Sequence, residues 1–246
     1  VHSETSTGVL NPIAELAGVV SDFDGVLLAV DGVTSVGGTR IDFENWGVDF
    51  MLTGSQKALA LPPGLAFAVA SDRALSRAES TPDRGYYFDL VEFDRRAREH
   101  ATTNTPAVSL LYALQYQLGR IAEEGLDERF ARHERMARRT AEWTEELAVT
   151  TGRRLEVLAP AGYRSPTVTA ISLPEGTSGP AVVGSLADEG ITIAPGYGKL
   201  KESVIRIGHM GDHTEDELEV VLDATAAVLG AVEHGTIETA TAHGGS

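Results

Sequence analysis

The sequence predicts an α/β protein with a large domain built on a mainly parallel sheet, followed by a smaller C-terminal α+β domain. Three observations predict this class: short apolar runs bounded by glycine or polar residues, long amphipathic segments between them, and closely spaced strand patterns after Gly152. Short apolar runs of this kind are typical of strands in parallel sheets. We therefore expect a large domain over residues 1–152, ending with a long connecting helix, and a small domain over residues 153–246.

The first domain is expected to open with a helix. Asn11 and Pro12 predict its start, with Asn11 as the cap, and the helix should run to about residue 20. The apolar runs at residues 25–30, 48–52 and 65–70 are expected strands, and residues 71–94 should be mixed and exposed. Amphipathic patterns then predict long helices over residues 106–124 and 126–151, each ending before a glycine. His133 should lie on a solvated face of the second helix.

The second domain shows a denser alternation of elements. Strands are expected at residues 155–158, 168–173, 191–194 and 204–207, with helices over residues 179–189 and 214–229. Thr214 and Glu217 have the spacing of a capping box, in which each side chain accepts from the backbone N–H of the other residue.

Composition and charge exclude several classes of function. The formal net charge of -16 argues against binding to a nucleic-acid backbone. No apolar run approaches the ~20 residues of a membrane helix. The absence of cysteine excludes disulfides and cysteine-ligated metals, and no pair of histidines has the spacing of metal ligands on a credible helix. We expect a cytoplasmic protein with no metal, nucleic-acid or membrane partner.

An acid and an amine are expected at one edge of the predicted sheet. Asp31 ends the first apolar run, and Lys57 follows the second. Ligands of open α/β sheets bind where the carboxyl ends of the strands meet. Lys57 is one of three lysines in a chain that otherwise uses arginine, and a lysine amine, unlike a guanidinium, can form a Schiff base with an aldehyde. The alternatives are that Asp31 caps the following turn and that Lys57 is a surface lysine.

Five segments in order carry a resemblance to a known family. They are residues 2–8 (His-Ser-Glu-Thr-Ser-Thr-Gly), 30–38 (Val-Asp-Gly-Val-Thr-Ser-Val-Gly-Gly), 54–59 (Gly-Ser-Gln-Lys-Ala-Leu), 104–106 (Asn-Thr-Pro) and 205–211 (Ile-Arg-Ile-Gly-His-Met-Gly). Together they resemble class V aminotransferases, which are fold type I enzymes dependent on pyridoxal 5'-phosphate, and most of all the alanine–glyoxylate and serine–pyruvate branch. The resemblance covers essentially the whole chain.

The resemblance implies a catalytic pair. Lys57 would form the Schiff base with the cofactor and then move protons at the substrate α-carbon. Asp31 would pair with the pyridine nitrogen and keep it protonated, so that the ring acts as an electron sink. Val33 would pack against one face of the ring, which differs little from ordinary core packing.

The resemblance also implies further contacts with the cofactor. Thr5 would contact its ring hydroxyl, with Ser6 and Thr7 as rivals. Gln56 would reach its phosphate, unless the amide simply faces solvent. Asn104 and Thr105 match a motif that reaches the phosphate of the partner subunit, which implies a homodimer with shared active sites. The alternative for these two residues is capping of the helix that follows Pro106.

Arg206 is the expected substrate-binding residue. An arginine within an apolar strand needs an anionic partner, and a substrate carboxylate would supply one by bidentate pairing. The alternative is a buried ion pair with an Asp or Glu.

The implied reaction is transamination between a small amino acid, alanine or serine, and a 2-oxo acid, glyoxylate or pyruvate. A phosphonate aminotransferase or a lyase of the same superfamily is an alternative. Family members also carry an N-terminal part with a glycine-rich phosphate loop and an aromatic residue that stacks on the ring, and neither is found in these residues. We therefore expect the C-terminal portion of a longer polypeptide. A catalytically incomplete fragment that serves as a dimerisation or interaction unit is the alternative from another class.

Overall fold

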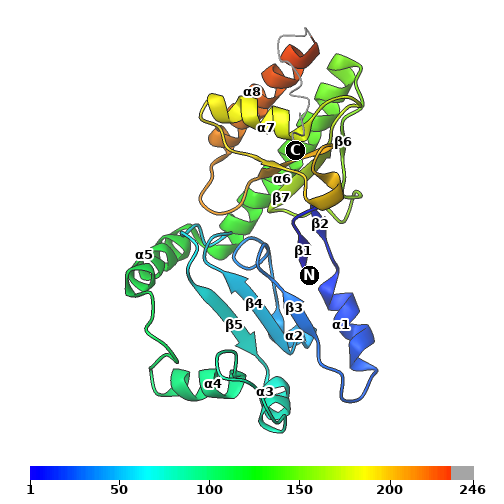
Figure 1. Cartoon of the computed structure of the whole chain (residues 1–246). Coiled ribbons are helices and arrows are strands. Elements are labelled where there is room, and N and C mark those ends of the chain that lie inside the picture. Colours follow the sequence, from blue (N-terminus) through cyan, green and yellow to red (C-terminus); the bar gives the residue numbers. More distant parts are fainter. Residues whose placement is uncertain (234–246) are drawn as a thin grey trace, which may run out of the picture. The chain divides into compact units, whose positions relative to one another are not determined.

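The computed structural model describes residues 1–233, which fold into two compact units (Figure 1). The first unit contains Val1–His2 and Pro12–Leu126, and the second contains Ser3–Asn11 and the chain from Asp127 onward. The long helix α6 (Leu126–Thr151) belongs almost entirely to the second unit. The division into domains at residue 152 stays a prediction.

A mixed three-stranded sheet in the order β3-β4-β5 forms the centre of the first unit. The strands are β3 (Ala29–Asp31), β4 (Phe50–Gly54) and β5 (Ala66–Ala70). β3 and β4 are parallel, whereas β4 and β5 are antiparallel, so the described sheet is less parallel than expected. The apolar run at residues 25–30 becomes a strand only at its end, where Val30 is buried and its two neighbours in β3 are exposed. β3 is an edge strand of the described sheet, paired only with β4.

Five helices accompany this sheet: α1 (Ile13–Ser21), α2 (Phe43–Trp46), α3 (Asp72–Glu79), α4 (Leu90–Arg98) and α5 (Val108–Glu124). The predicted cap of α1 is wrong, because the helix begins one residue later and its cap position, Pro12, has no side chain to accept a hydrogen bond. The segment of residues 71–94 is more helical than expected, since the Ser71 hydroxyl caps α3 by accepting from the Ala74 N–H at 3.1 Å.

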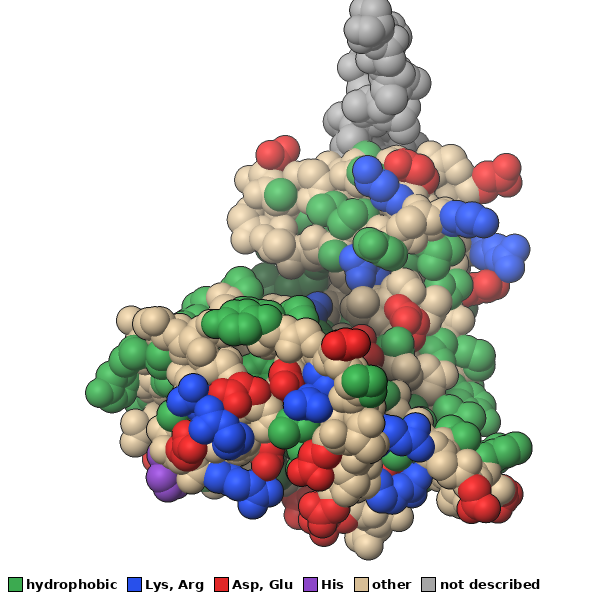
Figure 2. All heavy atoms as spheres, turned by 60° about the horizontal axis from the view of Figure 1, so that its bottom comes forward, with side chains coloured by type: hydrophobic (Ala, Val, Ile, Leu, Met, Phe, Trp, Pro, Cys, Tyr) green, Lys and Arg blue, Asp and Glu red, His purple; other side chains and the backbone are tan. Residues whose placement is uncertain are grey.

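The α3–α4 end of the first unit carries charges of both signs, which Figure 2 shows side by side. Within α4, Arg95 pairs with Glu92 at 2.6 Å and Arg98 pairs with Asp94 at 2.8 Å. Ion pairs between solvent-exposed side chains contribute little to stability, because water screens the charges and holding the two side chains in place costs entropy. This end therefore has the character of an ordinary solvated surface.

A small apolar core and one buried acid hold the first unit together. The core consists of Ile13, Val30, Val48 and Met51. Asp49 is buried, and its carboxylate accepts hydrogen bonds from the Leu28 N–H at 2.9 Å and the Ser71 hydroxyl at 2.8 Å. Asp49 thus ties the segment before β3 and the start of α3 to the start of β4.

The second unit is an α+β layer structure. Its antiparallel sheet has the order β6-β7-β9-β8, formed by β6 (Glu156–Val157), β7 (Val168–Ser172), β9 (Val204–Gly208) and β8 (Ala194–Pro195). Its helices are α6, α7 (Gly179–Asp188), α8 (Glu215–Glu233) and the short 3-10 helix η1 (Gly198–Leu200). A two-stranded hairpin, β1 (Ser3–Glu4) and β2 (Val9–Leu10), was not predicted. Its strands have only two residues each, which is too short for a periodic pattern.

The core of the second unit joins α6, α7 and α8 to one face of the sheet, through Met136, Leu186, Ile205 and Leu222 among others. The expectation for His133 is wrong, since its side chain is fully buried and its Nε2 lies 3.2 Å from the Gly211 carbonyl oxygen. A polar group on the buried side of a helix requires such a partner. The capping box of α8 is confirmed, because Thr214 and Glu217 exchange hydrogen bonds of 2.8 and 3.2 Å.

Candidate active site

The first group of predicted residues lies where β3 and β4 end. Asp31 pairs in register with Leu52, and the Gly32 N–H extends the ladder by donating to the Leu52 carbonyl oxygen at 2.9 Å. The Thr53 hydroxyl then donates to the Val33 carbonyl oxygen at 3.4 Å. Because the two strands are parallel, the loops that carry Asp31 and Lys57 leave the sheet at the same edge.

Asp31 makes the turn contact that was expected as its alternative role. Its Oδ1 accepts a hydrogen bond from the Val33 N–H at 2.9 Å, and the residue is exposed. The turn is tight, since a Cβ on Gly32 would lie 2.8 Å from Val36 Cγ2 and 3.0 Å from the Leu52 carbonyl oxygen. The contact uses one carboxylate oxygen, and within residues 1–233 no partner of the other is recorded.

Lys57 sits on a firmly held loop. The buried Ser55 hydroxyl donates to the Pro62 carbonyl oxygen at 2.7 Å and accepts from the Leu65 N–H at 3.2 Å. The Lys57 carbonyl oxygen accepts from the Ala60 N–H at 2.8 Å, while its half-buried side chain makes no hydrogen bond or ion pair with any described residue. The backbone is thus fixed, and the amine is not committed to a partner in the described chain.

The neighbouring candidates Val33 and Gln56 lie on the same two loops. Val33 is half-buried. Gln56 is exposed and folds back over Gly54, where an added Cβ would lie 2.5 Å from its Oε1. This placement corresponds to the solvent-facing alternative for Gln56.

Asn104 and Thr105 belong to the first unit and are exposed ahead of α5. The capping alternative is wrong: α5 begins at Val108, and its cap position, Ala107, makes no side-chain hydrogen bond. The Asn104 amide instead donates to the Thr103 hydroxyl at 3.2 Å. The helix starts too far beyond Pro106 for either side chain to reach its first N–H groups.

Thr5 and Arg206 meet within the second unit. Arg206 is the third residue of β9, where it is paired with Ala170 of β7 and Ala194 of β8. Its Nε donates to the Pro195 carbonyl oxygen at 2.9 Å, and its Nη1 donates to the Thr5 carbonyl oxygen at 3.2 Å. No carboxylate of the described chain forms an ion pair with it, so the ion-pair alternative is not observed. Backbone carbonyls orient the guanidinium without neutralising its charge.

The rivals of Thr5 lie in the same turn. Ser6 is committed to Glu4, since its hydroxyl and its N–H donate to Glu4 Oε1 at 2.6 and 2.9 Å. These hydrogen bonds hold the pKa of the Glu4 carboxyl below its usual range. Thr5 instead lies against Arg206, with its hydroxyl oxygen 3.5 Å from Nη1.

Two partners of Arg206 were missed by the sequence analysis. They are the carbonyl oxygens of Thr5 and Pro195, and a backbone acceptor carries no signal in the type of its residue. The Pro195–Gly196 pair, a dipeptide typical of turns, was the available cue.

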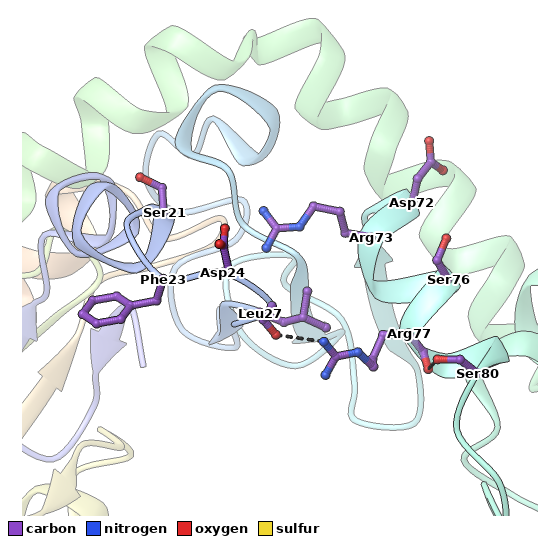
Figure 3. A pocket seen from close by; sticks show the side chains of 10 residues that line it. Ser21, Phe23, Asp24, Leu27, Asp72, Arg73, Ser76, Arg77 and Ser80 are labelled. Carbon is purple, nitrogen blue, oxygen red and sulfur yellow. Dashed lines mark hydrogen bonds between the residues drawn. The ribbon is translucent and has the colours of Figure 1, made fainter.

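The first unit contains a hollow of about 640 Å³ (Figure 3). It is lined by the segment before β3 and by α3, and Arg73 and Arg77 bind the carbonyl oxygens of Val26 and Gly25 there. None of the predicted site residues lines it.

Metal and membrane features are limited in the described chain. Residues 1–233 contain no group of three or more metal-ligating side chains. None of the helices described in this range is both long and apolar enough to cross a bilayer.

Comparisons with known proteins agree on one family. The family model described as "Aminotransferase class-V" matches residues 1–221. The chain is 39% identical to an uncharacterized aminotransferase of Methanocaldococcus jannaschii, in a match that covers 93% of this chain and 58% of the relative. It is 34% identical to a serine–glyoxylate aminotransferase of Arabidopsis thaliana, in a match that covers 93% of this chain and 57% of the relative.

Solved structures show the same likeness. The alanine–glyoxylate aminotransferase of Nostoc sp. superposes with a TM-score of 0.85 at 32% identity, over 93% of this chain and 60% of the other. The aspartate aminotransferase of Thermus thermophilus gives 0.81 at 34% identity, over 94% and 63%. These likenesses confirm the predicted fold class. The chain spans less than two thirds of the length of these relatives.

Proposed function

The chain belongs to the class V aminotransferase family, and from this premise we propose that it catalyses transamination dependent on pyridoxal 5'-phosphate. The donor would be a small amino acid, alanine or serine, and the acceptor a 2-oxo acid, glyoxylate or pyruvate. The observation that carries the proposal is the exit of the Asp31 and Lys57 loops at one edge of two hydrogen-bonded parallel strands.

The side chains at this edge fit the cofactor chemically. Lys57 offers an amine that no described residue engages, and Asp31 offers a carboxylate oxygen beyond its turn contact. When bound, the cofactor supplies an aldehyde that condenses with an amine and a protonated ring that withdraws electrons. An uncommitted amine and a carboxylate are the two groups that such a molecule requires.

Lys57 holds and moves protons in this proposal. Its amine would take the proton from the substrate α-carbon and pass it to the carbon of the cofactor that carries the transferred nitrogen, and it would move a proton in the opposite direction in the second half of the reaction. The loop anchored by Ser55 fixes the backbone from which the amine works. Asp31 supplies a negative charge beside the ring nitrogen, and Val33 limits the position of the ring.

Arg206 binds the substrate carboxylate in this proposal. Its Nε and Nη1 each donate to one carbonyl oxygen, so the described chain orients the guanidinium, and no described carboxylate forms an ion pair with it. A carboxylate then completes a charge-assisted, bidentate contact. Thr5, which lies against Arg206, would contact the ring hydroxyl of the cofactor.

A homodimer with shared sites is part of the proposal. Gln56 would hold the cofactor phosphate of its own subunit, and Asn104 and Thr105 would reach that of the partner subunit. Their exposure and the absence of a capping role support this assignment. Mixing Lys57→Ala and Asn104→Ala subunits should restore part of the activity, and two variants that stay inactive when mixed contradict the shared site.

Absorption spectroscopy and a substrate screen test the proposed function. The purified chain is mixed with the cofactor, reduced with borohydride and mapped by peptide mass spectrometry, and alanine and serine are then assayed with glyoxylate and pyruvate. Attachment at Lys57 with turnover supports the proposal. Attachment at other lysines, or none in a polypeptide as long as the relatives, overturns it.

A catalytically incomplete fragment is the second candidate, favoured by the fact that the chain spans 58% of the Methanocaldococcus relative. It would serve as a dimerisation or interaction unit. The mass of the natural protein separates the two: a longer polypeptide favours the enzyme, and a native mass near 26.1 kDa favours the fragment.

Two finer assignments complete the proposal. The cytoplasmic location is based on the absence of cysteine, which fits a reducing compartment. The boundary at residue 152 would separate a cofactor-binding domain from a small domain. Limited proteolysis around Gly152 checks the boundary, and fractionation of the source cells checks the location.

A further inference from the structure

Buried hydroxyl groups fasten the hairpin that carries Thr5 to the segment of residues 165–169. The Ser3 hydroxyl oxygen lies 2.7 Å from that of Ser165 and 3.3 Å from that of Thr167, and the last two are 2.9 Å apart. All three side chains are buried. The backbone adds a further bond, because the Ser165 N–H donates to the Gly8 carbonyl oxygen at 2.7 Å.

A buried histidine fastens the other end of the same segment. His209, the first residue after β9, has Nδ1 at 2.9 Å from the Pro166 carbonyl oxygen and Nε2 at 2.9 Å from the Thr169 hydroxyl oxygen. A carbonyl can only accept, so Nδ1 carries the proton and Nε2 accepts from Thr169. The His209 N–H also donates to the Thr167 carbonyl oxygen at 3.1 Å.

The hydroxyl cluster and His209 both connect the contact between Arg206 and Thr5 to the same segment. Ser3 precedes Thr5 by two residues, and His209 follows Arg206 by three. The segment of residues 165–169 is therefore a common anchor for the guanidinium and for one of the carbonyl oxygens that hold it. A shift at either attachment would change the distance between the two.

The other edge of β9 cannot fix this geometry alone. Its neighbour β8 has two residues, and one of them is Pro195, which lacks a backbone N–H. The register of β9 is set at its edge towards β7, by five pairs from Val168–Gly208 to Ser172–Val204, and His209 continues this pairing past the end of the ladder. A slip of one residue along that edge would move every side chain of β9 to the opposite face. Such a slip would remove Arg206 from the face that carries its partners.

We propose that His209 is a positioning residue, which holds the Arg206 guanidinium against Thr5 by locking β9 in register with residues 165–169. Its kinetic consequence depends on the proposed function, in which Arg206 binds the substrate carboxylate. The structural part of the proposal does not depend on catalysis.

Nitrogen-15 NMR of the arginine-labelled full chain tests the proposal directly. The Arg206 Nε–H signal is assigned by its loss in Arg206→Lys, and its hydrogen exchange with solvent is measured. His209→Ala should accelerate this exchange about tenfold, the scale of one lost hydrogen bond. His209→Asn, whose amide can still donate to the Pro166 carbonyl oxygen, should restore slow exchange. His213→Ala, which alters an exposed histidine nearby, is the matched control and should change nothing.

Unchanged exchange in a folded His209→Ala variant would overturn the proposal. Should that variant not fold, Thr169→Val removes only the hydroxyl that donates to the ring and should give the same acceleration. In a catalysing preparation, His209→Ala should raise the KM for pyruvate more than it lowers kcat. The exchange measurement needs neither cofactor nor turnover. A polypeptide as long as the relatives that lacks transaminase activity but shows accelerated exchange in His209→Ala therefore refutes the proposed function and leaves the positioning role standing.

Discussion

The Nη1 atom of Arg206 lies 3.2 Å from the carbonyl oxygen of Thr5, a residue 201 positions earlier in the chain. A second carbonyl oxygen, that of Pro195, accepts from Nε at 2.9 Å. Neither acceptor carries a formal charge, so the guanidinium is fixed in direction by neutral groups. No described carboxylate forms an ion pair with it, although the charge of Glu4 acts on it from a longer distance. This arrangement suits an arginine that binds an anionic ligand better than an arginine that forms a structural ion pair.

Replacement of Arg206 by lysine should therefore weaken substrate binding. An ammonium keeps the charge but loses the planar fork, so we expect the KM for the amino acid to rise by about 10–100-fold. Steady-state kinetics measure this change. Arg154→Lys is the control, because Arg154 forms an exposed pair with Glu156 elsewhere in the same unit. Equal KM values for the Arg206 variant and the wild type contradict the role.

Replacement of Lys57 by alanine should abolish both cofactor attachment and turnover. The amine is the only group of its kind at this edge of the described sheet, so we expect a loss on the order of 10⁴-fold or more. Borohydride reduction followed by mass spectrometry measures attachment. Lys199→Ala, which removes an exposed lysine of the second unit, should leave both properties intact. Attachment that persists in Lys57→Ala disproves the assignment.

Replacement of Asp31 by asparagine separates its two roles. The amide oxygen can still accept from the Val33 N–H, so the turn is preserved and only the charge is lost. An opposite charge at contact distance shifts a pKa by about 1–3 units, and each unit corresponds to about 1.36 kcal/mol. We therefore expect turnover to fall by about 10–1000-fold while Lys57 still attaches the cofactor. Undiminished turnover would mean that Asp31 serves the turn alone.

The stability of the chain should fall as the pH drops from 6.5 towards 3 because of His209, and His2, whose pKa burial lowers to about 4, adds a slope of the same sign. Burial is the main cause that lowers the pKa of His209 from 6.5 to about 3, so the unfolded chain binds a proton there that the folded chain excludes. Stability contributed in this way is present above the unfolded pKa and is lost as the pH falls, by about 1.4 kcal/mol per unit.

Urea unfolding at several pH values measures this slope. In His209→Asn the fall of the free energy of unfolding with pH should be less steep in this window, by about 1.4 kcal/mol per pH unit, because the group that takes up one proton on unfolding is gone. Carboxyl groups with a lowered pKa, such as Glu4, contribute a slope of the same sign only nearer their own ordinary value of 4.5. Identical slopes in the variant and the wild type would show that His209 is protonated in the folded chain.

The sequence predicted most elements of the second unit and the long helices because their patterns are long or their caps distinctive. Helix α6 was predicted to the residue, and the Thr214 capping box is present. The run at residues 25–30 was read as one buried strand, but only its end pairs with β4, since burial of a strand depends on its neighbours in the sheet. A sequence pattern shows where apolar residues lie along a strand, but it does not show which other elements pack against them.

The residues of the candidate site whose side chains carry the chemistry could be predicted from the sequence, whereas the contacts that hold them could not. Asp31 and Lys57 were paired by their places after two strands, and the parallel register bears out this common edge. The acceptors of Arg206 and the Ser3–Ser165–Thr167 hydroxyl cluster were not predicted, because they depend on contacts between distant segments. His133 was misplaced for the same reason, since its partner is a backbone carbonyl oxygen 78 positions away.

Gly196 should be intolerant of a side chain for a reason that also concerns Arg206. A Cβ at this position would lie 2.1 Å from the Leu200 carbonyl oxygen, which is backbone and cannot move alone. The Gly196 N–H also donates to the Val204 carbonyl oxygen at 2.7 Å. To accept alanine, the turn through η1 must open, and the adjacent Pro195 carbonyl oxygen that holds Arg206 must move with it.

Gly196→Ala should therefore lower the free energy of unfolding by about 1–3 kcal/mol, as overpacking does, and also raise the KM for the 2-oxo acid. Gly184→Ala is the matched control: Gly184 lies in α7 with nothing within 4 Å of an added Cβ, so alanine should stabilise the helix by about 1 kcal/mol and leave KM unchanged. Urea unfolding and steady-state kinetics measure the two effects separately. A destabilised Gly196→Ala variant with normal KM would show that the Pro195 contact does not control Arg206, because the turn would then have moved without disturbing substrate binding.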